Sequence, residues 1–203
     1  GHQAGKNDQE EFRGVGGMSD LPLVEIANAP LEIIDGDRGK NYPKQADFLD
    51  NGYCIFLNTT NVTRNGFSFT ERLFISEEKD ASLRKGRLLR DDVVLTTRGT
   101  IGNTAHFSRN VPYDNMRINS GMVILRCDTR NLLPVYLYHF LRSQLFQNQV
   151  HSLQTGVAQP QLPIRDLRRI KLPLTPISKQ DRIASTLSAY DDLIENNRRR
   201  IQL

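Results

Sequence analysis

Four polar segments of this sequence hold the side chains best suited to binding a polyanion. Arg and Lys bind phosphates and guanine edges, whereas Asn and Gln pair with adenine edges. The members of the four segments are Arg38, Lys40, Asn41, Tyr42 and Lys44; Thr97, Arg98, Thr100 and Asn103; Arg117, Asn119 and Ser120; and Gln154, Thr155, Gln159 and Gln161. We predict that these residues contact DNA. The alternative is that they form ordinary polar loops, in which Gly99 and Gly102 serve only turns.

The charge distribution favours the same kind of partner. The chain has 203 residues and a net charge of +4. Residues 1–36 hold two basic and seven acidic side chains, a net −5, so the remaining residues together carry +9. A basic body of this size suits nucleic acid, although many basic proteins bind none. Charge therefore supports the prediction only modestly.

A search for catalytic residue sets finds none with convincing spacing. The four histidines, His2, His106, His139 and His151, are scattered, and no Cys-x-x-Cys pair exists to hold structural zinc. Nucleotide-binding glycine loops and the Asn/Asp-Pro-Pro-aromatic tetrapeptide expected of an adenine methyltransferase are also missing. Glu77-Glu78-Lys79 has a nuclease-like Glu-x-Lys spacing, but its polar flanks favour a solvated turn. We predict a non-catalytic chain without a metal ion.

Cysteines and hydropathy indicate the cellular setting. Cys54 and Cys127 each lie within an apolar, strand-like run, which favours two buried, reduced thiols and a cytoplasmic protein. The longest apolar runs are far below the roughly 20 residues that a membrane helix needs. No secretory signal is visible at the start. We therefore expect a cytoplasmic protein with no membrane partner.

The polar segments must be positioned by short strands. Strand-like runs at 53–57, 67–69, 73–75, 93–97, 104–107 and 121–127 are separated by loops rich in Gly, Asn and Thr. A core-facing stripe predicts a helix over 134–150, with Pro134 in its first turn. Residues 1–17 have the composition of a flexible leader. We predict an α+β fold: a curled, mostly antiparallel sheet with flanking helices, followed by a long C-terminal coiled-coil helix.

The C-terminal helix has the spacing of a coiled-coil seam. Ser178 is a plausible N-cap, and Asp181 places negative charge near the helix N-terminus. The seam positions alternate by four and three residues: Ile183, Leu187, Tyr190, Ile194, Asn197 and Ile201. A helix that exposes such a stripe needs a partner, so the chain is predicted to be one part of a larger assembly.

Three stretches of the sequence form a recognisable set of motifs. The first is Ile-Asp-Gly-Asp-Arg-Gly-Lys-Asn-Tyr-Pro at 34–43, followed by residues 52–59. The second is Thr-Arg-Gly-Thr-Ile-Gly-Asn at 97–103, preceded by 91–96 and joined by 117–122. The third is Leu-Pro-Leu-Thr-Pro at 172–176, with Gln180, 182–184 and 191–195. Together they resemble the specificity subunit of type I restriction–modification systems, and the likeness spans roughly residues 21–203. It departs at Ser178-Lys179, where the family more often has an acidic residue.

The resemblance implies a division of labour. Residues 18–175 would be a target-recognition domain that reads one half of a bipartite site in double-stranded DNA. Residues 176–203 would be a conserved spacer helix that pairs with a counterpart and docks the modification subunit. That subunit methylates adenine with S-adenosylmethionine, and the restriction subunit, contacted indirectly, uses ATP and Mg²⁺. The resemblance thus implies no cofactor in this chain.

Several alternatives remain open from the sequence. A complete subunit of this family has two domain–helix units and this sequence has one. We expect it to be a fragment, a naturally half-length form that pairs with itself through the C-terminal helix, or the ordered part of a longer protein. A different class of function is a coiled-coil assembly or regulatory module without specific DNA binding. A stand-alone nuclease or methyltransferase is disfavoured because no cofactor loop is present.

Overall fold

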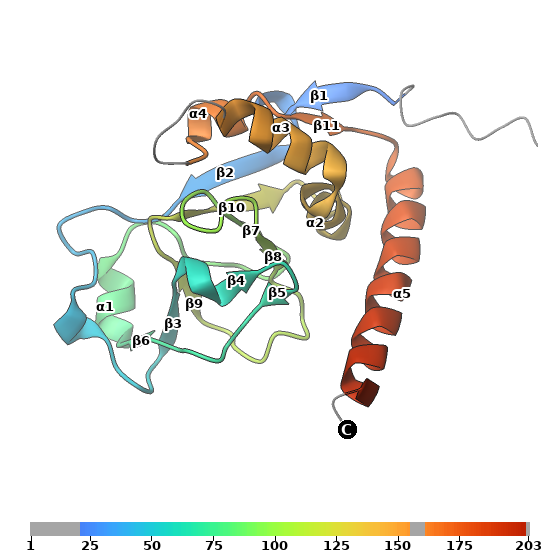
Figure 1. Cartoon of the computed structure of the whole chain (residues 1–203). Coiled ribbons are helices and arrows are strands. Elements are labelled where there is room, and N and C mark those ends of the chain that lie inside the picture. Colours follow the sequence, from blue (N-terminus) through green and yellow to red (C-terminus); the bar gives the residue numbers. More distant parts are fainter. Residues whose placement is uncertain (1–20, 155–160, 202–203) are drawn as a thin grey trace, which may run out of the picture.

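A four-stranded antiparallel sheet forms the centre of the molecule in the computed structural model, which describes residues 21–154 and 161–201 (Figure 1). The strand order is β2 (Leu31–Asp35), β10 (Met122–Cys127), β7 (Val93–Thr96) and β8 (Thr104–His106). The register places Val123 opposite both Asp35 and Leu95. The first residues of β10 therefore lie beside the last residues of β2 and β7.

Both faces of this sheet are buried, which explains the continuous apolar run of β10. Val123 and Leu125 face a core completed by α2 (Pro134–Arg142) and α3 (Gln144–Gln154). Met122 and Ile124, the alternate residues, face a second core. Strands buried on both faces lose the apolar–polar alternation of half-exposed strands.

The second core joins the central sheet to a smaller one. This sheet has the order β6 (Phe74–Ile75), β3 (Cys54–Leu57) and β9 (Met116–Ile118), and β3 pairs with β9 in parallel. The short helix α1 (Glu77–Ser82) follows β6, and Ser76 caps it by accepting the Lys79 N–H. The hairpin of β4 (Val62–Thr63) and β5 (Gly66–Phe67) lies beside β8.

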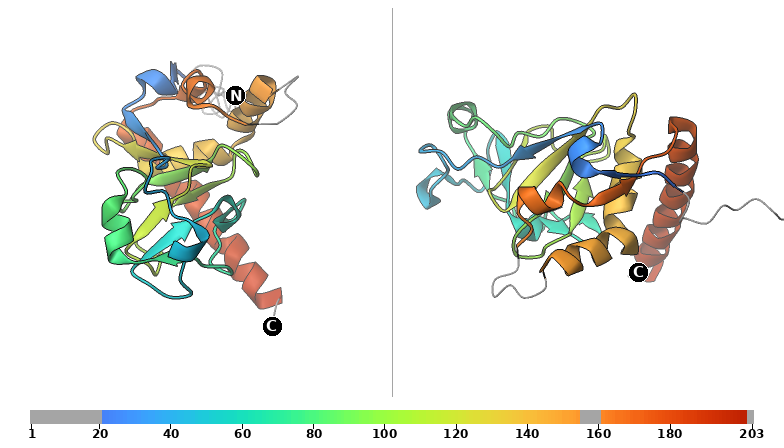
Figure 2. Two further views of the ribbon diagram at one scale, coloured as in Figure 1. Left: turned by 90° about the vertical axis from the view of Figure 1, so that its left-hand side faces the viewer. Right: turned by 90° about the horizontal axis from the view of Figure 1, so that it is seen from above.

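The two ends of the domain meet in a two-stranded sheet. Strand β1 (Leu23–Glu25) pairs with β11 (Lys171–Pro173), and β11 leads directly into the 25-residue helix α5 (Ile177–Ile201). The short helix α4 (Ile164–Leu167) precedes β11. Three 3-10 turns complete the described elements: η2 (Ile26–Asn28), η3 (Gln45–Asp47) and η4 (Thr59–Asn61). Figure 2 shows that α5 lies on the opposite side of the molecule from α1 and the loop after β2.

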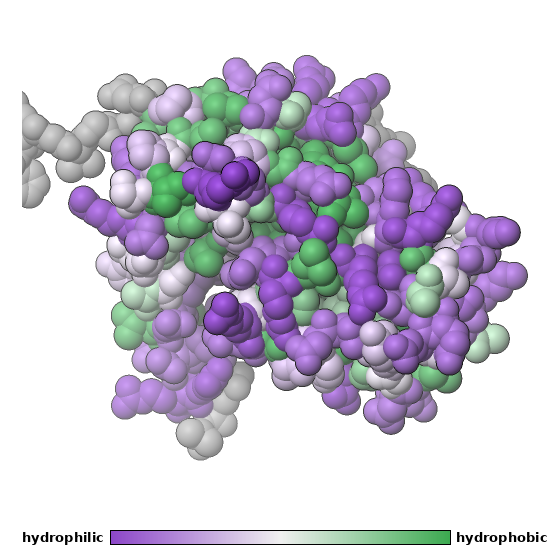
Figure 3. All heavy atoms as spheres, turned by 180° about the vertical axis from the view of Figure 1, so that it is seen from behind, coloured by the Kyte–Doolittle hydropathy of each residue, from purple (hydrophilic) through white to green (hydrophobic). Residues whose placement is uncertain are grey.

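The surface follows this arrangement. On the face seen from behind in Figure 3, hydrophilic residues cover most of the half opposite α5, and apolar residues gather in the upper part. No helix within residues 21–154 and 161–201 has both the length and the apolar character to span a membrane.

The structure has the expected α+β fold with mostly antiparallel pairing and a long C-terminal helix, but several elements differ from the prediction. The predicted helix over 134–150 is two helices, because Ser143 adopts an extended conformation between them. Residues 77–82 form a helix rather than a solvated turn. Helix α5 begins at Ile177, which places Ser178 inside the first turn instead of at the N-cap. The prediction also missed β2 and β9, which lie next to loops of strongly polar composition.

Candidate nucleic-acid interface

The strand register brings the predicted DNA-contacting segments together at one end of the central sheet. Residues 35–38 end and follow β2, residues 97–98 follow β7, and residues 119–121 precede β10. Residues 161–162 join them, because the Leu162 N–H donates to the Thr97 carbonyl at 2.9 Å. We call these four segments the loop junction. The antiparallel pairing of β2, β10 and β7 thus brings together segments that lie tens of residues apart in the sequence.

Backbone hydrogen bonds hold the loop junction. The Gly121 carbonyl accepts the N–H groups of Thr97 and Arg98 at 2.8 and 3.2 Å, and the buried Thr97 Oγ1 donates to it at 3.0 Å. Thr97 therefore supports the site and is not available to a ligand. Gly36 allows the segment after β2 to approach Asn119 closely, since a Cβ at position 36 would collide with the Asn119 carbonyl.

Two guanidinium groups remain available at this junction. Arg38 is half-exposed; its Nη2 donates to the Ser120 carbonyl at 3.1 Å and to Asp35 Oδ1 at 3.2 Å. Arg98 is exposed and has no ion pair among the described residues. Both line a pocket of about 250 Å³, whose other lining residues are Asp35, Thr97, Gln161, Leu162, Pro163 and Ile164. The arrangement can bind an anionic or hydrogen-bonding ligand against a partly apolar wall.

The turn that carries Arg98 requires glycine. Gly99 and Gly102 have φ values of 69° and 85°, in the left-handed region that other residues rarely adopt. The interpretation of these glycines as turn residues is therefore right for their backbone. It does not exclude a DNA contact, because Arg98 and Thr100 on the same turn are exposed.

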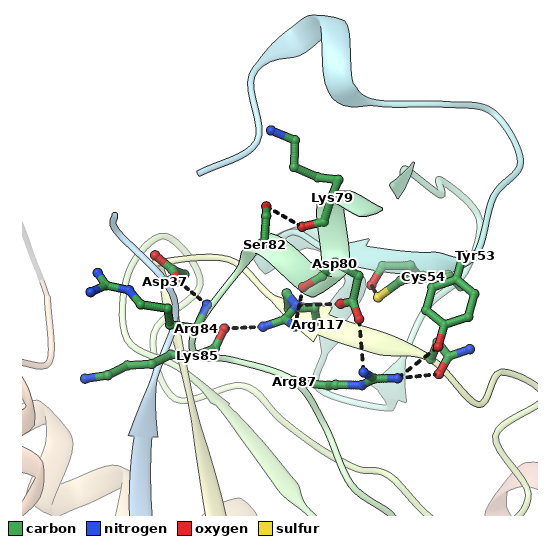
Figure 4. Close-up of polar contacts among 12 residues, drawn as sticks. Asp37, Tyr53, Cys54, Lys79, Asp80, Ser82, Arg84, Lys85, Arg87 and Arg117 are labelled. Carbon is green, nitrogen blue, oxygen red and sulfur yellow. Dashed lines mark hydrogen bonds and ion pairs between the residues drawn. The ribbon is translucent and has the colours of Figure 1, made fainter. Parts of the chain in front are cut away.

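Arg117 has a structural position. Its side chain is only 4% exposed; Nε donates to Asp80 Oδ1 at 2.7 Å, Nη2 to the Asp80 carbonyl at 3.0 Å, and Nη1 to the Lys85 carbonyl at 2.6 Å (Figure 4). Arg87 approaches the same buried carboxylate at 3.2 Å from the solvent side. We therefore correct the prediction that Arg117 contacts DNA: its side chain is buried and hydrogen-bonded within the domain.

Other predicted residues also support the loops. The Asn103 amide donates to the Val62 carbonyl, Asn119 Oδ1 accepts the Gly121 N–H, and the Asn41 amide donates to the Ser82 carbonyl. The Tyr42 ring packs edge-on against Phe56, with centroids 5.6 Å apart. These side chains shape the surface from behind rather than present free groups, although Asn41 itself is exposed.

The predicted residues thus separate into three groups. Those with exposed side chains are Arg38, Lys40, Asn41, Lys44, Arg98, Thr100 and Gln161. Those with buried or partly buried side chains are Tyr42, Thr97, Asn103, Arg117, Asn119 and Ser120. Lys40, Asn41 and Lys44 extend along the loop after β2, beyond the pocket. Thr155, Gln159 and the side chain of Gln154 lie outside the described residues.

Residues near the junction that the sequence reasoning missed are also basic. Arg165 and Arg168 are exposed on and just after α4, next to Ile164 of the pocket wall. Arg84 and Lys85 are exposed in the segment after α1. Adjacent basic residues are visible in the sequence at 84–85 and 168–169, but no sequence signal places residue 84 next to the loop after β2.

The chemistry of the described residues gives no sign of an active site. They contain no group of three His, Cys, Asp or Glu side chains that could hold a metal ion. Burial raises the pKa of both thiols, with a contribution from the nearby Asp80 carboxylate at Cys54, and each pKa reaches about 12. Both thiols therefore stay protonated and poorly nucleophilic at neutral pH. The prediction of buried, reduced cysteines agrees with a fully buried Cys54 and a partly buried Cys127.

The start of α5 is tied firmly to the domain. Gln180 is fully buried; its Oε1 accepts the Leu133 N–H at 2.9 Å, and its Nε2 donates to the carbonyls of Asn131 and Thr175 at 3.0 and 2.7 Å. Further along, Ser188 contacts His139 at 3.1 Å and Asp191 pairs with Arg142, both on α2. The helix direction is therefore set by side-chain hydrogen bonds from its first turn onward.

The predicted seam lies mainly in solvent. Ile183 is partly buried against the domain core, but Leu187, Tyr190, Ile194, Asn197 and Ile201 are exposed, as is Leu193, which the prediction omitted. At about 100° per residue, this stripe lies roughly a quarter turn around the helix from the docking side of Ala184, Ser188 and Asp191. The helix thus holds the domain with one side and leaves an apolar side free.

Comparisons with known proteins agree with this architecture. Residues 30–203 match the family model described as "Type I restriction modification DNA specificity domain". The chain is 28% identical over 151 residues to the type I restriction enzyme MjaIX specificity subunit of Methanocaldococcus jannaschii, covering 70% of this chain and 30% of that protein. It is 20% identical over 171 residues to the EcoKI specificity subunit of Escherichia coli, covering 81% and 36%.

Solved structures share the fold. The HsdS subunit from Thermoanaerobacter tengcongensis superposes with a TM-score of 0.57 at 19% identity, covering 92% of this chain and 40% of that one. The S subunit from M. genitalium gives 0.58 at 18% identity, covering 87% and 41%. The chain therefore spans about a third of the length of the curated relatives and about two fifths of these structures.

Proposed function

The chain belongs to the type I restriction modification DNA specificity family, and on that premise we propose that it is a non-catalytic DNA-recognition unit. In this proposal the loop junction reads one half of a bipartite site in double-stranded DNA. The observation that carries it is the convergence of Arg38, Arg98 and Gln161, from three separate segments, on one pocket. A surface made of several rigidly held loops can present different side chains to successive base pairs.

The side chains at the junction suit base-edge recognition. Exposed Arg groups pair with guanine, exposed amides with adenine, and apolar side chains contact the thymine methyl group. Arg98 and Gln161 supply the first two, and the partly buried Ile164 supplies the third. The Arg38 guanidinium is already oriented by Ser120 and Asp35, so little conformational freedom would be lost on binding.

Catalysis is proposed to lie in partner subunits. The relatives are named specificity subunits, and the described residues of this chain offer neither a metal-ligand group nor a reactive thiol. A modification subunit would supply adenine methylation with S-adenosylmethionine, and a restriction subunit would supply ATP- and Mg²⁺-dependent cleavage. This chain would contribute sequence choice and geometry.

Helix α5 is proposed to connect the recognition unit to those partners. Its apolar stripe would pair with a counterpart helix, in a second copy or a second half of a longer chain, and the assembled helices would dock the modification subunit. The exposure of Tyr190 at 61% and Ile201 at 84% supports a face awaiting a partner. Pairing of two such helices would hold two loop junctions at a fixed separation.

The test is selection of DNA from a random duplex pool by the chain together with its modification subunit. We expect an enriched half-site with the partner present. The absence of any enriched sequence, with the protein folded and the complex formed, would contradict sequence-specific recognition. The same selection with Arg98→Ala should relax the preference at one or two positions while keeping the rest.

An assembly or regulatory module is the second candidate, favoured by the exposed stripe on α5 alone. In that case binding to DNA would be weak and would respond little to salt. DNA binding through several phosphates should instead fall steeply as salt rises. Titrations at several salt concentrations therefore distinguish the two functions.

A further inference from the structure

A second basic surface lies beside the loop junction. It consists of Lys40, in the loop after β2, and Arg84 and Lys85, in the segment after α1, and we call it the basic ledge. All three side chains are exposed. Figure 4 shows Arg84 and Lys85 directed to the same side as Asp37 and away from Arg87 and Tyr53. The side chains of Arg84 and Lys85 are thus directed away from the neighbouring Arg87–Asp80–Arg117 network, to which the Lys85 carbonyl is bonded.

One buried carboxylate holds the two halves of the ledge together. Asp37 is 5% exposed; its Oδ1 accepts the Gly39 N–H at 2.6 Å and its Oδ2 the Arg84 N–H at 2.7 Å. Burial alone would raise the pKa of Asp37, but hydrogen bonds from the backbone of Gly39, Arg84 and Lys85 lower it overall. Asp37 is therefore ionised. Its two oxygens accept backbone N–H groups from two separate segments, and Arg84 is 47 residues away from Asp37 along the chain.

The charge of the ledge is not neutralised by ion pairs. Within the described part of the chain, Lys40, Arg84 and Lys85 have no carboxylate within 4.0 Å, although Asp37 interacts with Arg84 at longer range. Neighbouring basic residues differ in this respect: Lys79 pairs with Asp47, and Arg87 with Asp80. Three basic side chains beside the one carboxylate of Asp37 leave a net positive charge at a fixed position, which favours an anionic ligand.

The ledge is shaped and supported from below. A hollow of about 300 Å³ is lined by Asp37, Gly39, Lys40, Asn41, Ser82 and Arg84. The Lys85 carbonyl accepts Arg117 Nη1, and the next carbonyl, that of Gly86, accepts the Ile118 N–H at 2.8 Å. These bonds attach the segment after α1 to β9, so the basic side chains project from a rigid base.

The ledge is continuous with the loop junction. Gly36 of the junction lies close to Asn119 and Ser120 and also to Gly86, the residue after Lys85 of the ledge. Arg38 of the junction and Lys40 of the ledge are two residues apart on the same loop. A duplex that lies on the junction would therefore bring its sugar–phosphate backbone within reach of the ledge.

We propose that the basic ledge binds phosphate groups of the DNA backbone next to the sequence read at the loop junction. The ledge holds the duplex in register and does not itself choose bases, because the neighbouring amide, Asn41, is already bonded to Ser82. This inference rests on the proposed DNA-recognition function.

The test compares Arg84→Ala/Lys85→Ala with the unaltered chain, each bound to the modification subunit, by fluorescence anisotropy on the selected duplex and on a shuffled duplex. We expect both affinities to fall by the same factor, about tenfold or more near physiological salt. The slope of log affinity against log salt should decrease by about 0.9 for each phosphate that is no longer bound, and the enriched sequence should be unchanged. Arg109→Ala, which removes an exposed arginine from the loop after β8, is the matched control and should change little.

Each outcome is decisive. An unchanged salt slope in a variant with a normal melting temperature overturns the proposal that the basic ledge binds phosphates. A loss confined to the selected duplex would make Arg84 and Lys85 base-reading residues and would also overturn it. Weakened capture of the modification subunit with unchanged DNA binding would assign the ledge to an acidic protein surface instead. If the unaltered chain enriches no sequence, the proposed recognition function fails, while the change in salt slope still measures the ledge separately.

Discussion

The loop junction and the outer half of α5, the two surfaces proposed to bind partners, are built in opposite ways. The junction collects short pieces between residues 35 and 162, and most of its polar groups are used to hold those pieces together. Helix α5 presents a single run of 25 residues whose apolar stripe is largely unused within the chain. The two surfaces lie on opposite sides of the molecule (Figure 2). A discontinuous surface depends on its buried supports, whereas a helical one depends mainly on its own spacing.

The largest effect should come from breaking a buried support of the recognition side. Arg117→Met leaves the buried Asp80 with Arg87 as its remaining basic partner, and we expect a loss of about 3 kcal/mol in unfolding free energy. DNA affinity should fall as well, because the Lys85 carbonyl loses its anchor. Urea denaturation measures the first effect. Arg87→Met, at the more exposed partner, should cost clearly less; equal losses would refute the assignment of Arg117 as the main support.

The corresponding support on the helix side is Gln180. Gln180→Leu leaves the partly buried Leu133 N–H and two carbonyls without their partner, which should cost about 2 kcal/mol. Because the same bonds orient α5, assembly with the modification subunit should weaken while DNA contacts at the junction remain. Thermal unfolding and co-purification measure the two effects. An unchanged melting temperature would show that α5 is held by other contacts.

An exposed residue of the junction should separate function from stability. Arg98→Ala removes a guanidinium without an ion pair in the described structure, so we expect about a tenfold loss of DNA affinity and an unchanged melting temperature. Anisotropy and calorimetry on one preparation give both quantities. A melting temperature lowered by several degrees with retained affinity would place Arg98 among the supports.

The exposed seam should respond to substitution without affecting the fold. Asn197→Leu adds an apolar group to the stripe, and we expect stronger but less register-specific self-association. Sedimentation velocity over a concentration series measures it. Unchanged sedimentation would argue against α5 as a pairing helix. Asn196→Leu, the same substitution at an exposed position on the other side of the helix from the seam, is a suitable control.

The smallest effect concerns pH at the contact between α5 and α2. Burial lowers the pKa of His139, and the nearby Asp191 only partly offsets this. The unfolded chain therefore binds this proton more readily than the folded chain. Stability is highest above the unfolded pKa near 6.5 and falls as the pH drops from that value through the lower folded pKa. His139→Gln can keep a hydrogen bond to Ser188 and should lose less melting temperature between pH 7.5 and 5. An identical pH dependence would exclude His139 as a contributor. Some dependence should remain, because burial also lowers the pKa of His106.

The seam illustrates what sequence reasoning predicts well. Residue spacing alone indicated the stripe from Leu187 to Ile201, because a helix repeats its faces every 3.6 residues whatever surrounds it. Only Ile183 was misjudged as a free seam residue, since the domain core that covers it comes from distant segments. Leu193 was missed because it lies at the margin of the stripe.

The candidate site was predicted less completely. Residue types singled out segments that the fold brings together, but Arg98 and Arg117 looked equivalent in the sequence. One is exposed, and the other is enclosed by Asp80 and Lys85, at positions 37 and 32 residues away. Asp37 also looked like an ordinary loop residue, whereas it joins the two halves of the basic ledge.

The sequence by itself determined the chemical character of both surfaces: a basic, amide-rich set of loops and an amphipathic helix with a free apolar stripe. Only the tertiary structure decided which polar groups are available to a ligand. The physical reason is that each polar group can make only a few hydrogen bonds. Whether those bonds are already made depends on neighbours that the antiparallel pairing of β2, β10 and β7 brings from far along the chain.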